Sequence, residues 1–212
     1  MSEMDESDLT VAVLAGGNSS RFKTDKAFAP FNGRPLVEHM MGIASQISPN
    51  LLLVLSAGQE AAKFSEIVGE ARVVRDPEDS VKSALTGAVT AFEFAETQYT
   101  LLLPVDTPLA SPVLLRMLAD LAPRHGAVVP SWPSGYIEPL HAVYLSEHAY
   151  AHGLHVLESG KYRMRNLLDA LRNVLFVSTM VLEQFDSELN TFRNINTLEQ
   201  LQELETIARK RF

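Results

Sequence analysis

A glycine-rich loop with three cations follows the apolar run 10–14 near the start of the chain. Its adjacent glycines, Gly16 and Gly17, and the small polar residues after them would let backbone amides approach phosphate oxygens. The cations of the loop are Arg21, Lys23 and Lys26. The loop does not end in the Gly-Lys-Ser/Thr of a Walker loop, and it does not contain the Gly-x-Gly-x-x-Gly motif of dinucleotide-binding folds. It therefore predicts a triphosphate site of another kind, with a simple turn after a strand as the alternative.

A single carboxylate follows a second apolar run. Asp106 comes directly after residues 100–105 and precedes Thr107 and Pro108. A carboxylate at the end of a buried strand can hold Mg²⁺, which takes oxygen ligands and shares them with substrate phosphates. A turn-forming or helix-capping Asp is the alternative. The two loops together suggest nucleotidyl or phosphoryl transfer, in which catalysis is chiefly positioning and charge neutralisation.

Alternating strand and helix patterns must position these loops. The expected strands are 10–14, 51–55, 72–74, 100–105, 127–130, 140–144 and 174–177. The expected helices are 35–47, 81–94, 111–121 with Ser111 as its cap, and one from about 197 with Leu198, Leu201, Leu204 and Ile207 in register. Repeated strand–helix units predict an α/β fold with a mostly parallel sheet and helices on both faces. In such a sheet ligands bind beyond the carboxyl ends of the strands, where both loops begin.

Composition restricts the class of protein. The 212 residues contain 18 Lys and Arg against 26 Asp and Glu, a net charge of −8 that opposes non-specific binding to nucleic acid or anionic lipid. The absence of Cys excludes disulfides, Cys-ligated metals and thiol nucleophiles. The apolar runs are too short to cross a bilayer and residues 1–8 lack a signal-peptide pattern, so we expect a cytoplasmic protein without nucleic-acid or membrane partners. We expect residues 1–212 to form one domain, with 1–8 as a flexible acidic tail.

The motifs, taken in order, resemble those of one known family. Leu14-Ala15-Gly16-Gly17, Ser20-Arg21 and Asp25-Lys26-Ala27 are similar to the signature loop of GT-A-like nucleotidyltransferases, in the form typical of molybdenum cofactor guanylyltransferases (MobA) and their cytidylyltransferase relatives. Further similar motifs are Gly33-Arg34-Pro35-Leu36 with His39, Asp106-Thr107-Pro108, Glu138-Pro139-Leu140 with Tyr144, Glu158-Ser159-Gly160 and Phe192-Arg193-Asn194-Ile195-Asn196-Thr197. The resemblance covers most of the chain.

This resemblance implies a three-layer, Rossmann-like GT-A fold and an Mg²⁺-dependent enzyme. The implied reaction transfers GMP from GTP to the terminal phosphate of molybdopterin and releases pyrophosphate, and a molybdenum cofactor chaperone or acceptor enzyme is an implied partner. By position, the resemblance implies that the nucleotide is bound by the backbones of Leu14, Ala15, Gly16 and Gly17 and by the side chain of Asp76. It implies catalytic roles for Arg21, Lys26 and Asp106. The implied metal ligands are Asp106 and either Asn194 or Asn196. Lys26 and Asp106 would also contact the nucleotide. No general base is assigned, because the attacking phosphate is already anionic.

Three departures from the family pattern bear on activity, in the case of Phe22-Lys23, or on the choice of base, in the case of Gly58 and Ser83. Phe22-Lys23 stands where the family usually has Met-Gly, Gly58 where it often has Asn near the base, and Ser83 where it often has Gly followed by Pro. The preference for GTP therefore rests on the resemblance. Transfer of CMP or another NMP to molybdopterin or a different phosphorylated acceptor stays open, as do a non-catalytic nucleotide-binding role and the oligomeric state.

Two groups of rings have functional and structural interpretations. One is His148, His152 and His155, which fall at helical spacing and could ligate a metal. With only Glu147 and Glu158 beside them, a solvated or packed helix face is favoured. The other is Trp132, Tyr136 and His141. These rings could stack on a pterin or pack within their own loop.

Overall fold

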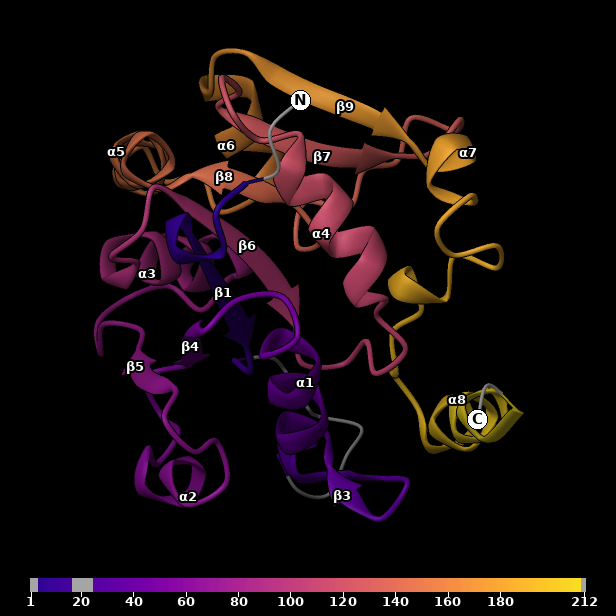
Figure 1. Ribbon diagram of the computed structural model, residues 1–212. Helices are drawn as coiled ribbons and strands as arrows, with labels where there is room; N and C mark the ends of the chain where they lie inside the picture. Colours follow the sequence, from indigo (N-terminus) through magenta and orange to yellow (C-terminus); the bar gives the residue numbers. More distant parts are fainter. Residues whose placement is uncertain (1–3, 17–24, 211–212) are drawn as a thin grey trace.

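Seven strands form the central sheet of the computed structural model, which describes residues 4–16 and 25–210 (Figure 1). The strands are β1 Leu9–Leu14, β4 Asn50–Leu55, β5 Arg72–Arg75, β6 Tyr99–Pro104, β7 Ala127–Ser131, β8 Val143–Leu145 and β9 Val174–Ser178. Their order across the sheet is β5-β4-β1-β6-β8-β7-β9. Only β8, among these strands, runs antiparallel to its neighbours. The predicted α/β fold with a mostly parallel sheet is confirmed.

The central strands are buried on both faces. In β1, Val11 and Val13 belong to one core cluster, whereas Ala12 and Leu14 belong to a second cluster. Successive side chains of a strand point to opposite faces, so the two clusters lie on the two sides of the sheet. This double burial explains why residues 10–14 are apolar throughout rather than alternating with polar residues.

Helices cover both faces and make the fold three layers. One face carries α1 Leu36–Ala44 and α4 Pro112–Asp120, and the other carries α3 Ala84–Phe94, α5 Ser146–Glu158 and α6 Met164–Ala170. Two single-turn helices, α2 Ala62–Ser65 and α7 Thr179–Leu182, follow β4 and β9. Within the described part of the chain no helix has the length and apolarity needed to cross a bilayer.

The last helix builds a separate apolar cluster. α8 Leu198–Lys210 packs against the hairpin of β2 Pro30–Phe31 and β3 Arg34–Pro35, and Glu205 Oε1 accepts a hydrogen bond of 2.7 Å from the Asn32 amide. The buried members of the cluster are Ala29, Phe31, Leu36, Leu109, Ile195, Leu201, Leu204 and Ala208. Leu198, which we expected on the apolar face, is 60% exposed. The helix therefore joins the N-terminal hairpin to the segment before α8.

Several boundaries differ from those expected, each for a local reason. α3 begins at Ala84 rather than at residue 81, because the Ser83 side chain caps it by accepting from the Thr86 amide. β8 begins at Val143 rather than at residue 140, because a turn precedes it in which the His141 amide donates to the Glu138 carbonyl at 3.1 Å. The cap predicted at Ser111 is confirmed by its bond from the Leu114 amide.

Met4 and Glu6, within the segment 1–8 that we expected to form a flexible acidic tail, contact α4. Met4 is buried and its amide donates to Asp120 Oδ1 at 3.0 Å. Glu6 forms an ion pair with Arg116 of α4, and Asp5 caps a short 3-10 helix over Glu6–Asp8. The side chains of Asp5 and Glu6 therefore have specific partners.

Gly126, which precedes β7, tests how tightly the sheet edge is packed. A Cβ at this position would lie 2.2 Å from the Arg172 carbonyl oxygen, so we expect Gly126→Ala to destabilise the fold by about 1–3 kcal/mol in urea unfolding. The matched control is Gly42→Ala in α1, where no neighbouring atom lies within 4 Å. That substitution should be neutral or stabilising by about 0.5–1 kcal/mol. Equal effects at the two sites would contradict the packing described.

Candidate functional site

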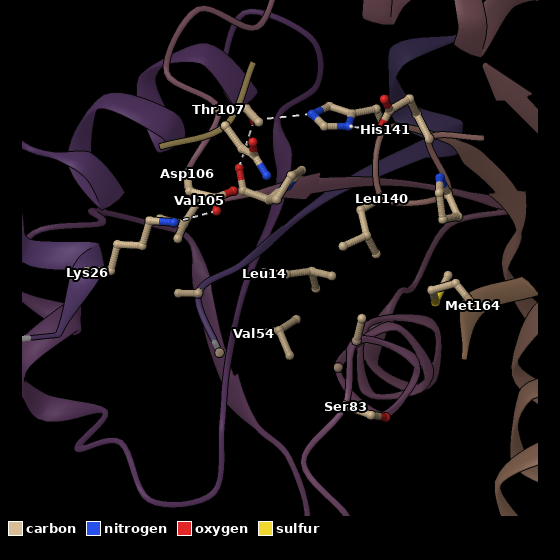
Figure 2. Close-up of a pocket in the computed structure, with 18 of the residues that line it drawn as sticks. Leu14, Lys26, Val54, Ser83, Val105, Asp106, Thr107, Leu140, His141 and Met164 are labelled. Atoms are coloured by element: carbon tan, nitrogen blue, oxygen red, sulfur yellow. Dashed lines mark hydrogen bonds and ion pairs between the residues drawn. The ribbon is translucent and has the colours of Figure 1, made fainter. Parts of the chain in front are cut away.

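The two loops singled out from the sequence follow neighbouring strands. β1 and β6 pair in parallel with Leu14 opposite Pro104, so the segments that contain Lys26 and Asp106 begin at the same edge of the sheet. A cleft of about 600 Å³ lies at this edge (Figure 2). β4 and β6 lie on either side of β1 and connect onward in opposite directions across the sheet. Such a switch point is the usual ligand-binding position of an open parallel sheet.

Lys26 and Asp106 form an ion pair in the cleft. The Lys26 ammonium donates to Asp106 Oδ2 at 2.6 Å, and their side chains are 16% and 22% exposed (Figure 2). These residues are 80 positions apart in the chain, so the fold rather than the sequence brings them together. The pair places an ammonium group and a carboxylate, which could bind phosphate and a divalent metal respectively, within one hydrogen bond of each other.

Asp25 and Gln59 hold the segment that carries Lys26. Asp25 caps the 3-10 helix Lys26–Phe28 by accepting from the Ala27 amide at 3.1 Å. The Gln59 amide donates to Asp25 Oδ2 and to the Ala15 carbonyl, and its oxygen accepts from the Ser56 amide at 2.7 Å. One side chain therefore ties together the segments after β1 and β4. Sequence reasoning missed Gln59, since these partners are distant in the chain.

The start of the glycine loop is packed against β4. The Ala15 amide donates to the Val54 carbonyl at 2.9 Å, and the Leu14 carbonyl accepts from the Val105 amide at 3.1 Å. A Cβ at Gly16 would lie 3.0 Å from the Ser56 amide nitrogen, so glycine permits this close approach. Leu14, Ala15 and Gly16 all line the cleft. The predicted site residues Gly17 and Arg21, together with Phe22-Lys23, lie outside the described residues.

The Asn194–Asn196 segment crosses beside Asp106. The Ile195 amide donates to the Asp106 carbonyl at 2.8 Å, while the Ile195 side chain is buried in the α8 cluster. The flanking side chains of Asn194 and Asn196 line the cleft and bond to each other at 3.3 Å. Alternation along an extended segment thus places one side chain in the core and two amides at the site.

These oxygen donors fit a magnesium ion that is shared with substrate. Asp106, Asn194 and Asn196 supply one carboxylate and two amide oxygens around the cleft. Among residues 4–16 and 25–210, no group of three or more His, Cys, Asp or Glu is placed to hold a metal by itself. Mg²⁺ commonly takes one or two carboxylates and completes its shell with water and substrate phosphates, so this sparse set is suitable.

Asp76 lies on another wall of the cleft, directly after β5. Its amide donates to the Leu55 carbonyl at 2.8 Å, and its buried carboxylate accepts from Thr90 Oγ1 at 2.7 Å. Burial raises the pKa of Asp76, while the Thr90 hydrogen bond and the Lys82 charge oppose that rise. Ser83 also lines the cleft, whereas Gly58 lines an adjoining hollow with Asp76 and Lys82.

Glu138 and His141 form a polar corner of the cleft, which sequence reasoning did not predict, because it considered His141 only as a stacking or packing ring. His141 Nε2 lies 3.3 Å from Thr107 Oγ1, next to Asp106 (Figure 2), and burial lowers the His141 pKa to about 3. The Trp132 indole N–H donates to Glu138 Oε1 at 2.8 Å, and burial raises the pKa of Glu138 although this bond opposes the rise. The sequence signal was present only as the Glu138-Pro139-Leu140 motif, to which no role was attached.

The two groups of rings behave differently in the structure. Of the aromatic platform, Tyr136 and His141 line the cleft, whereas Trp132 is placed edge-on to Phe192 at 6.0 Å. The histidines lie on α5, where the rings of His148 and His152 are 4.5 Å apart. Burial and the neighbouring His152 and Arg172 charges lower the pKa of His148. Since no metal-holding group occurs in the described ranges, a packed and solvated helix face is the better interpretation of these histidines.

Comparison with known proteins identifies the family. The family model described as MobA-like NTP transferase domain matches residues 11–174. The chain belongs to this family. It is therefore a nucleotidyltransferase, as the motifs predicted, and the matched region includes most of β1, all of β6, and Lys26 and Asp106.

Individual relatives support the same assignment over nearly the full chain. A probable molybdenum cofactor guanylyltransferase of Methanosarcina mazei is 27% identical over 95% of this chain and 92% of its own length. Another of Pyrococcus horikoshii is 30% identical over 91% and 97%. The crystal structure of molybdopterin-guanine dinucleotide biosynthesis protein A from Archaeoglobus fulgidus is similar with a TM-score of 0.81, at 27% identity over 95% of this chain and 99% of that one.

The buried His141 makes stability depend on pH. Its pKa is about 3 in the folded protein against 6.5 normally, so between these values the unfolded chain binds one more proton and stability falls as pH falls. Below pH ~6 protonation of His141 in the unfolded chain should cost the wild type about 1.4 kcal/mol of stability per pH unit. We expect His141→Gln, which has no titrating ring, to lack this part of the loss. Urea unfolding of both proteins at several pH values measures the difference. Parallel pH profiles would show that His141 is not buried as a neutral ring.

Proposed function

We propose that the protein catalyses Mg²⁺-dependent transfer of GMP from GTP to the terminal phosphate of molybdopterin. The observation that carries the proposal is the 2.6 Å contact of Lys26 with Asp106 in a cleft at the carboxyl ends of β1 and β6. The names of the relatives from M. mazei and P. horikoshii support the guanylyl donor and the molybdenum cofactor acceptor. The acceptor phosphate oxygen forms a bond to the α-phosphorus, the α–β bridging bond breaks, and pyrophosphate leaves.

In this proposal the residues of the cleft supply charge and position. Lys26 neutralises negative charge on the α-phosphate and on the leaving pyrophosphate, and Arg21 has the same role from its predicted loop position. Asp106, with Asn194 or Asn196, would hold Mg²⁺, which when bound supplies further positive charge at the phosphates. No general base is required, because the attacking phosphate is already an anion.

The Lys26–Asp106 ion pair must be exchanged when substrate binds. In the structure each charge neutralises the other. Phosphate oxygens would replace Asp106 as the partner of Lys26, and the metal would replace Lys26 as the partner of Asp106. Asp76 and the backbone of Leu14, Ala15, Gly16 and Gly17 are proposed to contact the nucleotide.

The choice of nucleotide is tested directly. The protein is incubated with Mg²⁺, molybdopterin and one of GTP, CTP, ATP or UTP, and pyrophosphate and the dinucleotide product are measured. We expect release with GTP at least about tenfold faster than with CTP, the order of discrimination that a few hydrogen bonds provide. Release with CTP alone would replace the guanylyl assignment by the cytidylyl one, and GTP binding without turnover would indicate a non-catalytic protein.

The ion pair is tested by removing either charge. We expect Lys26→Ala and Asp106→Ala each to lower turnover by roughly a hundredfold or more, as the loss of an electrostatic stabiliser does in other enzymes. Lys63→Ala is the matched control, because Lys63, on α2, is exposed and its ion pair is with the exposed Glu60. Initial rates of pyrophosphate release measure the effect. Near-normal rates in both cleft variants would contradict the proposed site.

A further inference from the structure

A rigid turn holds the Glu138 carboxylate at the cleft. The Glu138 amide donates to the Pro130 carbonyl at 3.0 Å, and the Trp132 amide donates to the Tyr136 carbonyl at 2.8 Å. Trp132 Nε1 then fixes Glu138 Oε1 at 2.8 Å. Among the described residues no hydrogen-bond donor reaches Oε2, although the Glu138 side chain is only 14% exposed. One oxygen of this carboxylate is therefore anchored and the other lacks a partner.

His141 presents a second hydrogen-bond acceptor beside that oxygen. The Thr107 hydroxyl donates its single hydrogen to the Pro104 carbonyl at 3.1 Å, so it can accept a hydrogen bond at 3.3 Å from His141 Nε2 in the tautomer whose ring proton is on Nε2. Neutral His141 then leaves a lone pair on Nδ1, which is buried without a hydrogen-bond partner. Nδ1 lies 3.9 Å from Glu138 Oε2. Two acceptors face each other with no hydrogen between them.

We propose that Glu138 selects a substrate ring that offers adjacent N–H donors, namely the ring N–H and exocyclic amino group of a 2-amino-4-oxopyrimidine edge. This inference rests on the proposed function, in which guanine and the pterin of the acceptor both have that edge. Cytosine presents one amino donor beside a ring acceptor, so it would place a lone pair against a carboxylate oxygen. Glu138 contacts the N–H donors of the ring. His141 is a positioning residue behind Glu138, and its Nδ1 carries no proton that would compete with the ring for Oε2.

In a competing arrangement Glu138 and His141 form a hydrogen bond with each other. If Glu138 were protonated, its hydroxyl would donate to His141 Nδ1 and no substrate donor would be needed. Glu138→Gln separates the two cases, because glutamine matches the shape of a protonated glutamate and its NH₂ group can donate to Nδ1 in the same way. Glutamine would leave an internally satisfied corner intact, whereas it would remove the negative charge from a corner that binds donors.

The test measures equilibrium binding, so that it does not depend on turnover. Calorimetry compares GTP with ITP, which lacks the 2-amino group, and fluorescence titration compares pterin with lumazine, in which an oxo group replaces the amino group. The pterin titrations include a non-hydrolysable GTP analogue. We expect Glu138→Gln to weaken GTP, pterin or both by about tenfold or more, with ITP and lumazine changed less than about twofold. Loss confined to GTP identifies guanine as the ring bound, and loss confined to pterin identifies the acceptor.

Controls separate recognition from folding. Glu183→Gln alters an exposed carboxylate that does not line the cleft, and it should leave all four affinities unchanged. Trp132→Phe removes the donor to Oε1 and should weaken the same ligand as Glu138→Gln, by a smaller factor. The inference is overturned if Glu138→Gln binds all four ligands as the wild type does, if it weakens analogues with and without the amino group equally, or if the wild type shows no preference for the amino-bearing rings. The binding measurements do not involve turnover, so the pyrophosphate assay tests the proposed function separately from this inference.

Discussion

The parallel pairing of β1 with β6 is the constraint on which the site depends. Both strands are buried on their two faces, and their register sets Leu14 against Pro104, so the segments that follow them leave the sheet at the same level. A slip of one residue would turn every side chain of β1 toward the wrong core cluster. The same hydrophobic burial that stabilises the sheet therefore fixes the separation of Lys26 and Asp106.

Around this pair, each wall of the cleft comes from a different part of the chain. Gln59 links the segments after β1 and β4, the Ile195 amide reaches the Asp106 carbonyl, and Thr107 connects Asp106 with His141. Backbone amides and carbonyls provide much of this bonding. Side chains at the surface of the cleft are thus supported by groups that have few alternative conformations, an arrangement suited to positioning phosphates.

Local patterns in the sequence predicted the parts of the structure that local physics controls. Apolar runs located β1, β4 and β6, and Ser111 before Pro112 located the start of α4. The Lys26–Asp106 contact followed from the rule that strand ends share an edge. Gln59 and Glu138 were given no role, and His141 was considered only as a stacking or packing ring, because a polar side chain in a loop carries no local mark of burial. The contacts of Gln59 with Asp25 and of His141 with Thr107 also join residues that lie far apart in the sequence. The start of β8 was misplaced since the turn closed by Glu138 and His141 competes with an extended conformation.

The position of α8 has a consequence for protein synthesis. Ile195, Leu201 and Leu204 bury the N-terminal hairpin residue Phe31 and Leu109, and the segment before the helix donates to Asp106. A nascent chain that has left the ribosome only through β9 contains every strand of the sheet but lacks this clamp. Because the segment before α8 also carries Asn194 and Asn196, which line the cleft, one wall of the cleft is synthesised only after every strand of the sheet.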